Sequence, residues 1–550
     1  METITETETK KSRSVLLWIL IVLAPLIAGW LIGLISGTSP LKLDAWNTTW
    51  SDENGYYRVI RTMRYYGVPQ GMTGFNEITS GNVPFGPYNL FSYIPYYLLS
   101  FATGCTSHNY IYICNIIMAV LANVFFVVLV RPGRRQSFLT ALFFLTQLIA
   151  ARYTWSGMAE ASYHFYIVVF MGLVIWYLRS ADASLACKNI ALLAMILLTF
   201  CFSVMRPYFL PLFLIPLYLL IFRNPRMGLV GRFLFALLIL ASMAGALVLM
   251  YYLMNYIAEY FEIAPAMRLA QLILGGGVKG IVSGLVQTNK DSVHAAMDLV
   301  REYRWAGGVA FLFYFEWILL FLEFIYSLIA RRKDGSTAVL FLLLFSGALI
   351  YEATIMLYKS YQLHRMLLAI TIAFTLFLIE FGIALPWVNS IAVICLVAFY
   401  VLMKPSGFAL PQTADTTVSA AEYQTYKKEL VSLLPYADPI ASTQGGTREN
   451  KKSRILDAFE TPASLDPYWN NTVAKITEDN HIQLSYLMPD YLSFNICTEK
   501  YMKKAITSDS FNSRYVMVKT DSKLDKLCAD RYRLLWQKHD HSIYDRQEKP

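Results

Sequence analysis

Two adjacent acidic residues, Asp52 and Glu53, follow the first apolar segment of the chain and stand among the aromatic residues of the run 50–57. A carboxylate held beside a hydroxyl group can act as a general base, which is worth roughly 10²–10⁴-fold in rate. The plainer interpretation of an Asp–Glu pair is a solvated turn in a loop. Which interpretation applies depends on the segments that surround the pair.

Three basic residues could hold an anion. Arg365 stands at the start of one apolar segment, Arg206 at the end of another, and Lys279 in the Gly-rich run 275–280. An arginine guanidinium matches two phosphate oxygens at once, whereas a lysine acts as a point charge. The Gly-rich run lacks the other residues of a P-loop, so we do not expect a nucleotide site. The alternative role for each residue is an anchor whose charge reaches the lipid headgroups.

Glu160 and His164 lie four residues apart at the start of a further apolar segment. In a helix this spacing places both side chains on one face, where they could hold a divalent metal ion. The spacing fixes no third ligand. We therefore favour a hydrogen bond between the two side chains and keep a divalent metal cofactor as the alternative.

The composition identifies a membrane as the surroundings of these residues. Of the 550 residues, 56% are hydrophobic and only 15% are charged, and the mean hydropathy is +0.43. Soluble domains carry about 25% charged residues. The composition therefore excludes a soluble enzyme, a disordered chain and a fibrous protein. Many apolar runs approach the ~20 residues that cross ~30 Å of hydrocarbon, so we expect a multi-pass membrane protein.

The fold class that we predict is an all-α transmembrane bundle of about eleven helices. They are expected at residues 15–36, 109–130, 136–152, 161–178, 188–205, 207–222, 233–257, 307–330, 337–358, 366–384 and 388–403. The positive-inside rule assigns the basic connections to the cytoplasm, which places the N-terminus inside and the C-terminus outside. These connections are residues 131–135, 179–188, 223–232 and 331–333.

The net charge of +9 lies entirely in residues 1–404, because residues 405–550 hold 19 basic and 19 acidic residues. Such an excess is typical of cytoplasmic loops and does not indicate a nucleic-acid partner. Residues 90–101 are too short to span and carry their apolar residues on one face, so we expect an interfacial helix there. If this helix crossed the membrane, every later segment would be reversed and the positive-inside pattern would be broken.

We therefore divide the chain into a transmembrane domain, residues 1–404, with external loops at 37–108 and 258–306, and an extracytoplasmic domain, residues 405–550. In the second domain, the apolar runs 514–519 and 531–536 flank a helix-like stretch, which predicts a small α/β domain. Its two cysteines, Cys497 and Cys528, could form a disulfide in an oxidising compartment or remain free thiols.

The order of motifs along residues 14–385 resembles the GT-C superfamily of membrane glycosyltransferases, which includes the aminoarabinose and protein-mannosyl transferases. In that superfamily a first span is followed by an acidic pair, by juxtamembrane helices, and by a span that ends in a short basic turn. Residues 52–53, 86–104 and 131–135 follow this order. The run 361–368 is similar to the superfamily's aromatic-rich His-Arg-Tyr-Leu-Leu motif, with Met366 where tyrosine is common.

The resemblance implies transfer of a sugar from a polyprenyl-phosphate donor to a hydroxyl acceptor on the outer face of the membrane, with inversion. It makes Asp52 the base and Glu53 its support, and it implies a glycan, a lipid or a protein as the acceptor. It also implies a bacterial plasma membrane, whose lipids surround the protein. The donor phosphate is expected to lie against Arg365, Arg206, Lys279 and His364. In metal-using relatives, an acid near the position of Glu160 helps to hold the ion.

Two other functions fit a polytopic membrane protein. A transporter or lipid flippase would explain the four glutamates inside predicted spans, although transporters usually show two related halves. These residues are Glu316, Glu323, Glu352 and Glu380. A charge at the bilayer centre costs roughly 2.5–3.5 kcal/mol, so we expect each of them to face protein or a wet cavity, or to be protonated. A ligase that joins whole glycan chains would carry its main acceptor machinery in a late loop, whereas the acidic pair here is in the first.

Overall fold

The computed structural model divides the chain into two compact units. Unit 1 contains Met1–Leu43, Tyr112–Leu249 and Glu262–Leu410, and unit 2 contains Asp44–Ile111, Met250–Phe261 and Pro411–Pro550. The expected boundary at residue 404 lies near the division at 410, but the first external loop belongs to unit 2. The structure describes residues 2–36, 53, 56–57, 60, 72–77, 82–84, 90–103, 109–255, 264–302, 305–330, 335–357, 363–382, 385–403, 420–435, 472–476, 488–489, 491–511, 513–538 and 540–546.

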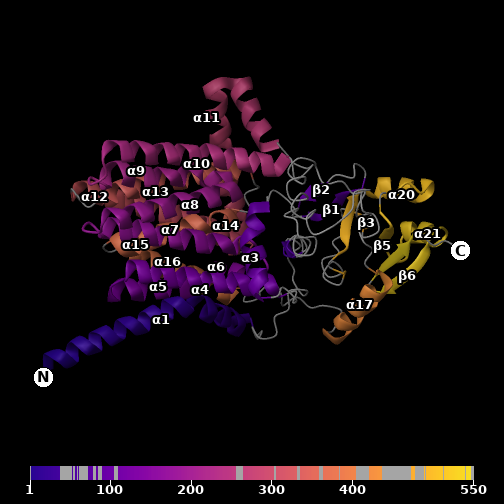
Figure 1. Ribbon diagram of the computed structural model, residues 1–550, viewed down its shortest axis with the longest axis horizontal. Helices are drawn as coiled ribbons and strands as arrows, with labels where there is room; N and C mark the ends of the chain where they lie inside the picture. Colours follow the sequence, from indigo (N-terminus) through magenta and orange to yellow (C-terminus); the bar gives the residue numbers. More distant parts are fainter. Residues whose placement is uncertain are drawn as a thin grey trace. The chain divides into compact units, whose positions relative to one another are not determined.

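Unit 1 is a bundle of α-helices (Figure 1). Among the described residues, seven helices are long and apolar enough to cross a membrane. They are α1 (Glu2–Ser36), α4 (Tyr110–Val130), α7 (Ala161–Arg179), α8 (Leu185–Met205), α10 (Leu229–Asn255), α12 (Trp305–Ile329) and α13 (Ser336–Leu357). Shorter apolar helices are η4 (Pro207–Phe213) with α9 (Leu214–Arg223), α15 (Leu368–Phe381) and α16 (Leu385–Met403).

Each of the eleven predicted spans has a helical counterpart, so the helical membrane bundle is confirmed. The span expected at 136–152 is divided at Gln147 into α5 (Arg134–Thr146) and α6 (Leu148–Thr154). The segment expected at 366–384 is likewise divided into α14 (Leu363–Met366) and α15. Because these helices are shorter than a full crossing, the number of spans stays a prediction.

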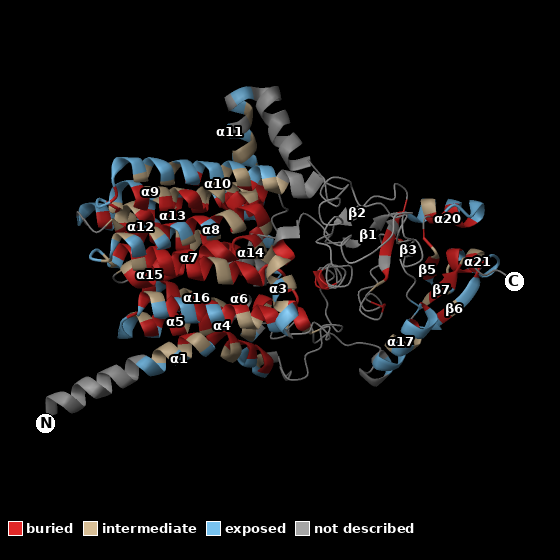
Figure 2. Cartoon of the chain, viewed as in Figure 1, coloured by how far each residue is buried: buried red, intermediate tan, exposed pale blue. Residues whose placement is uncertain are grey.

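Helices α7 and α15 form the centre of unit 1. Every residue from 368 to 380 in α15 is buried, and 83% of the apolar window of α7 is buried. In α10 the corresponding fraction is 11%, and Figure 2 shows the contrast between the red α7 and the largely exposed α10. A helix that is apolar all round is buried in protein or faces lipid. Helix α15 is covered by α5, α7, α12 and α16, whereas α10 presents its apolar side chains outward.

Three of the four intramembrane glutamates bind polar groups on other helices. Thr375 Oγ1 donates a hydrogen bond to Glu316 Oε1 at 2.8 Å, and Asn289 Nδ2 donates to Glu352 Oε1 at 2.8 Å. Glu380 forms an ion pair with Arg179, which joins α15 to α7. The fourth, Glu323, is buried. Glu316, Glu323 and Glu380 are thus buried in protein, whereas Glu352 is half-buried and lines a cavity between helices.

The second external segment contains a long helix that the sequence did not predict. Helix α11 (Ala264–Arg301) is bent at Gly277, whose φ of +53° is a conformation that L-residues with a side chain rarely adopt. Beyond this bend the helix packs against α12 and α13. Residues 90–101, where we expect an interfacial helix, are helical as η3 (Leu90–Tyr93) and α3 (Ile94–Thr103), and their place in the interface stays a prediction. The ten residues of α3 reach about 15 Å, which is too short for a span.

Unit 2 contains a seven-stranded sheet in the order β2-β1-β4-β3-β5-β7-β6. Its strands are β1 (Met72–Asn76), β2 (Asn82–Pro84), β3 (Thr472–Ile476), β4 (Ser493–Cys497), β5 (Tyr515–Lys519), β6 (Arg533–Lys538) and β7 (His541–Asp545). The helices described in the C-terminal part are α17 (Ala420–Leu433), α20 (Glu499–Ser508) and α21 (Lys523–Ala529). The predicted C-terminal α/β region is confirmed, and β5, α21 and β6 coincide with the three segments that predicted it.

The first external loop contributes two strands to this sheet. Strand β1 runs parallel to β4, with Gly74 opposite Phe494. Directly after β1, the buried Glu77 accepts hydrogen bonds from Asn495 Nδ2 at 2.9 Å and from Ser513 Oγ at 2.5 Å. The loop that carries the acidic pair is therefore joined to the C-terminal residues by a sheet and by a buried carboxyl group.

Cys497 and Cys528 are free thiols in the core of the C-terminal region. Both side chains are buried, and Cys497 Sγ lies 3.5 Å from the carbonyl oxygen of Lys475. Burial, and to a smaller extent the neighbouring charge of Asp525, raises the pKa of the Cys528 thiol to about 12. Because the thiolate is the reactive form, both groups should be inert in the folded protein.

We therefore expect Cys497 and Cys528 to react with a maleimide at pH 8 at least about tenfold more slowly than the exposed Cys187 in the same native sample. After denaturation without reductant, all three should be labelled, as peptide mass spectrometry would show. If Cys497 and Cys528 were labelled only after a reductant had been added, a disulfide would join them and the assignment as thiols would be wrong.

Candidate active site

The acidic pair of the first external loop is described in part. Asp52 lies outside the described residues, and Glu53 is fully buried. The aromatic residues that follow it are also buried: Tyr56 and Tyr57 are at most 1% exposed, and the Tyr56 ring lies 5.8 Å from that of Tyr93 in η3. The plainer interpretation, a solvated turn, does not apply to Glu53, because its side chain and those of Tyr56 and Tyr57 are buried.

The expected anion-binding residues belong to unit 1, where Arg365 and Glu160 form a buried ion pair. Arg365 lies in the short helix α14, and Glu160 directly precedes the first residue of α7. The Glu160 side chain is fully buried and that of Arg365 is 13% exposed. The ion pair thus holds Arg365 at the N-terminus of α7, although 205 residues separate the two partners along the chain.

Arg206 approaches the same turn of α7 from another helix. It ends α8 and is 2% exposed, and its Nε donates a hydrogen bond to the hydroxyl of Tyr163 at 2.7 Å. Tyr163 lies three residues after Glu160, one turn along α7. Arg365 therefore binds Glu160 at the start of α7, and Arg206 binds Tyr163, three residues further along the chain.

Aromatic rings surround this cluster. The Tyr163 ring lies 5.3 Å from that of Phe202 and 5.8 Å from that of Phe209, and the last two rings stack at 3.7 Å. Next to Arg365, Met366 Sδ accepts a hydrogen bond from the Tyr208 hydroxyl at 3.2 Å. The rings exclude water from the two guanidinium groups and strengthen their attraction for an anion, since Coulomb energies grow as the dielectric constant falls.

The described geometry does not fit the alternative of a metal ion at Glu160 and His164. Glu160 is paired with Arg365, and His164 Nε2 lies 3.3 Å from Asn123 Oδ1. No group of three or more His, Cys, Asp or Glu side chains that could hold a metal ion occurs in the described part of the chain. The predicted Glu160–His164 hydrogen bond is not formed either, because each side chain has another partner, and we derive no metal-dependent step.

The other two expected phosphate ligands are not part of this cluster as described. Lys279 is exposed on α11, two residues after the bend at Gly277. His364 lies in α14 beside Arg365, and its side chain is outside the described set. Sequence reasoning missed Tyr163 and Asn123. Tyr163 has one usable signal, its position one helical turn after Glu160.

Comparison with known proteins gives structural matches only. No protein-family model and no curated protein matches the sequence. The apo oligosaccharyltransferase of Archaeoglobus fulgidus matches with a TM-score of 0.48 and 12% identity, over 94% of this chain and 72% of that chain. ArnT from Cupriavidus metallidurans, bound to undecaprenyl phosphate, matches with a TM-score of 0.44 and 11% identity, over 96% and 97%.

Both neighbours are glycosyltransferases of the GT-C superfamily, which is the superfamily that the motif order resembles. Since each TM-score is below 0.5, we base no assignment on these matches.

Electrostatically, the cluster suits an anion. Arg365 pairs with Glu160 directly before α7 and Arg206 binds Tyr163 in its first turn, and the N-terminus of a helix adds a partial positive charge. Backbone N–H groups at such a terminus can also bind phosphate oxygens. The arrangement can therefore bind a phosphate and stabilise it as a leaving group.

A double-mutant cycle tests the ion pair. Glu160→Gln and Arg365→Gln should each lower the thermal unfolding temperature, because removal of one partner of a buried pair costs about 3–5 kcal/mol. The double variant should lose less than the sum of both, with a coupling of about 0.5–3 kcal/mol.

The matched control is the exposed pair Asp298 and Arg301, whose Asp298→Asn and Arg301→Gln variants should show no measurable coupling. Additive effects of the Glu160 and Arg365 substitutions would contradict the buried ion pair.

Proposed function

We propose that the protein is a membrane glycosyltransferase that transfers a sugar from a polyprenyl-phosphate donor to a hydroxyl acceptor on the outer face of the membrane. The observation that carries this proposal is the cluster of Arg365, Arg206 and Glu160 in the helical bundle. Two arginines at the end of a membrane bundle suit a phosphate attached to a lipid, whose chain can remain in the bilayer. The order of motifs in the sequence supports the same function.

In the proposed reaction, the acceptor oxygen attacks the anomeric carbon of the sugar and the polyprenyl phosphate leaves. Asp52 takes the proton of the acceptor hydroxyl as the new bond forms, and Glu53 supports Asp52. Phosphate needs little acid assistance as a leaving group, so its negative charge is the main demand on the protein. The guanidinium groups of Arg365 and Arg206 meet that demand. A single displacement of this kind inverts the configuration of the carbon.

The location follows from the same proposal. We place the protein in a bacterial plasma membrane, with a cytoplasmic N-terminus and an extracytoplasmic C-terminal region. The acceptor is a hydroxyl of a glycan, a lipid or a protein. Two of the glutamates that motivated a transporter, Glu316 and Glu380, bind groups on neighbouring helices. These two residues need no transport function to explain their position in the bundle.

Replacing Asp52 tests the catalytic base. Asp52→Asn should lower kcat by roughly 10²–10⁴-fold, because the amide keeps the size of the side chain and cannot accept the proton. The measurement is transfer of labelled sugar from a panel of polyprenyl-phosphate sugars by the purified protein. Asp298→Asn, on the exposed part of α11, is the matched control and should leave transfer unchanged. Normal turnover by Asp52→Asn would remove this residue from the mechanism.

Replacing the arginines by lysine tests the phosphate site. Arg365→Lys and Arg206→Lys keep the positive charge and lose the two-pronged contact, so each should weaken competitive inhibition by polyprenyl phosphate about tenfold. Arg226→Lys is the control, because Arg226 binds the carbonyl of Ala183 in a predicted cytoplasmic connection. An unchanged inhibition constant in both arginine variants would refute the phosphate site, whatever the outcome for Asp52.

A further inference from the structure

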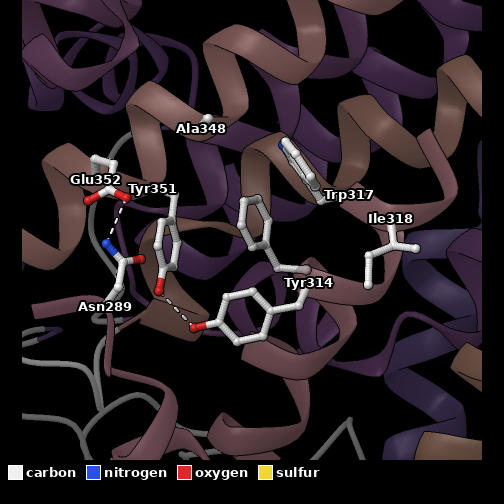
Figure 3. Close-up of a pocket in the computed structure, with 8 residues that line it drawn as sticks. Asn289, Tyr314, Trp317, Ile318, Ala348, Tyr351 and Glu352 are labelled. Atoms are coloured by element: carbon white, nitrogen blue, oxygen red, sulfur yellow. Dashed lines mark hydrogen bonds between the residues drawn. The ribbon is translucent and has the colours of Figure 1, made fainter. Parts of the chain in front are cut away.

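A cavity of about 360 Å³ lies between α11, α12 and α13, and its described lining includes none of Arg365, Arg206 and Glu160. Figure 3 shows the aromatic side chains of α12 and α13 around it, with a carboxyl group and an amide at one side. The volume lies in the range of small-ligand sites. The lining residues that matter for its chemistry are Phe313, Tyr314, Trp317, Tyr351, Asn289 and Glu352.

The carboxyl group that lines this cavity, Glu352, accepts a hydrogen bond on one of its two oxygens. Asn289 Nδ2 donates to Glu352 Oε1 at 2.8 Å and to the carbonyl of Leu285 at 2.9 Å, so the amide donor is fully used. Glu352 Oε2 is buried and accepts no hydrogen bond from the described residues. The hydroxyls of Tyr314 and Tyr351 bind each other at 2.8 Å (Figure 3). One carboxylate oxygen therefore has no hydrogen-bond donor among the described residues, and the described residues of the lining include no basic side chain.

The remaining wall is aromatic. The rings of Phe313 and Tyr351 stack with centroids 5.5 Å apart, and Tyr314 meets Tyr351 edge-on at 5.6 Å. The Trp317 N–H donates to the carbonyl of Leu344 at 3.3 Å, and its ring lines the cavity and stacks on Phe321 with centroids 5.9 Å apart. Aromatic faces attract cations through their quadrupole, and this attraction strengthens when the cation is removed from water. Aromatic rings around a carboxylate are the surroundings that an organic cation prefers.

The cavity is lined at one side by a residue on the apolar outer surface of the bundle. Ile318 belongs to the lining and is 51% exposed, and its neighbours Phe321 and Phe345 are exposed as well. Glu352 lies five residues before the end of α13 at Leu357, about 8 Å along the helix. At this depth a lipid headgroup can reach the carboxyl group while its chains stay beside α12.

We propose that this cavity binds the primary ammonium group of a membrane amphiphile, such as the ethanolamine headgroup of a phospholipid. The ammonium donates a hydrogen bond to Glu352 Oε2 and lies against the rings of Tyr351 and Trp317. A neutral hydroxyl could donate the same hydrogen bond, but it would leave the negative charge of Glu352 uncompensated in apolar surroundings. A primary ammonium supplies both the N–H donor and the opposite charge.

Binding is tested on the purified full-length protein in detergent, by native mass spectrometry with short-chain phospholipids. Dihexanoyl-phosphatidylethanolamine should bind at least about tenfold more tightly than dihexanoyl-phosphatidylglycerol, because a charge-assisted hydrogen bond is lost with the second lipid. Phosphoethanolamine without chains should bind more weakly than the ethanolamine lipid. Equal binding of the two lipids would overturn the proposal, and equal binding of phosphoethanolamine would overturn the assignment to a lipid.

Two variants locate the site. Glu352→Gln should abolish the preference for ethanolamine, whereas Glu323→Gln, which removes a buried carboxyl of α12 outside the lining, should retain it. Ala348→Leu fills the cavity without touching the carboxyl group and should also abolish the preference. If both Glu352→Gln and Ala348→Leu kept the preference, the ammonium would bind elsewhere. The experiment measures lipid binding rather than sugar transfer, so its outcome tests this site independently of the proposed enzyme activity.

Discussion

A guanidinium and a carboxylate that are buried together, Arg365 and Glu160, constrain the arrangement of unit 1. Either charge alone in apolar surroundings would cost several kcal/mol, so α14 must meet the start of α7 in every folded copy of the bundle. The central position of α7 and α15 makes this possible, because α15 follows α14 directly and packs along α7. At the opposite end of the same two helices, Arg179 and Glu380 form a second ion pair. Two charge pairs thus fix the register of the central helices.

The fold could be predicted where the signal was local. Apolar runs of about twenty residues predict membrane helices, and the alternating apolar runs 514–519 and 531–536 predicted strands β5 and β6. The sequence pattern did not predict the helix where glycines interrupt it. Gly275, Gly276 and Gly277 suggested a loop, although only Gly277 departs from helical geometry in α11. It failed again for β1 and β2, because a strand of three to five residues whose main partner lies far along the chain leaves little trace in its own composition.

The candidate site shows the same division. Residue type and position at the ends of apolar segments singled out Arg365 and Arg206, because a guanidinium there can bind a phosphate or a lipid headgroup. The residues that pair with these two arginines could not be predicted from the sequence. Glu160 appeared to belong with His164, four residues away on one helix, yet it pairs with Arg365 on another. The cavity of Figure 3 needs three helices, and no single segment of the sequence shows it.

The strands that the first loop contributes to the C-terminal sheet impose an order on biosynthesis. The buried Glu77 and its donor Asn495 are 418 residues apart. At roughly 5–20 residues per second, translation needs about 20–80 s to cover that distance. During this interval β1 can pair with its neighbour β2, but its other edge has no partner and is open to pairing with a foreign strand. The loop that carries the acidic pair therefore matures only after nearly the whole chain has been made.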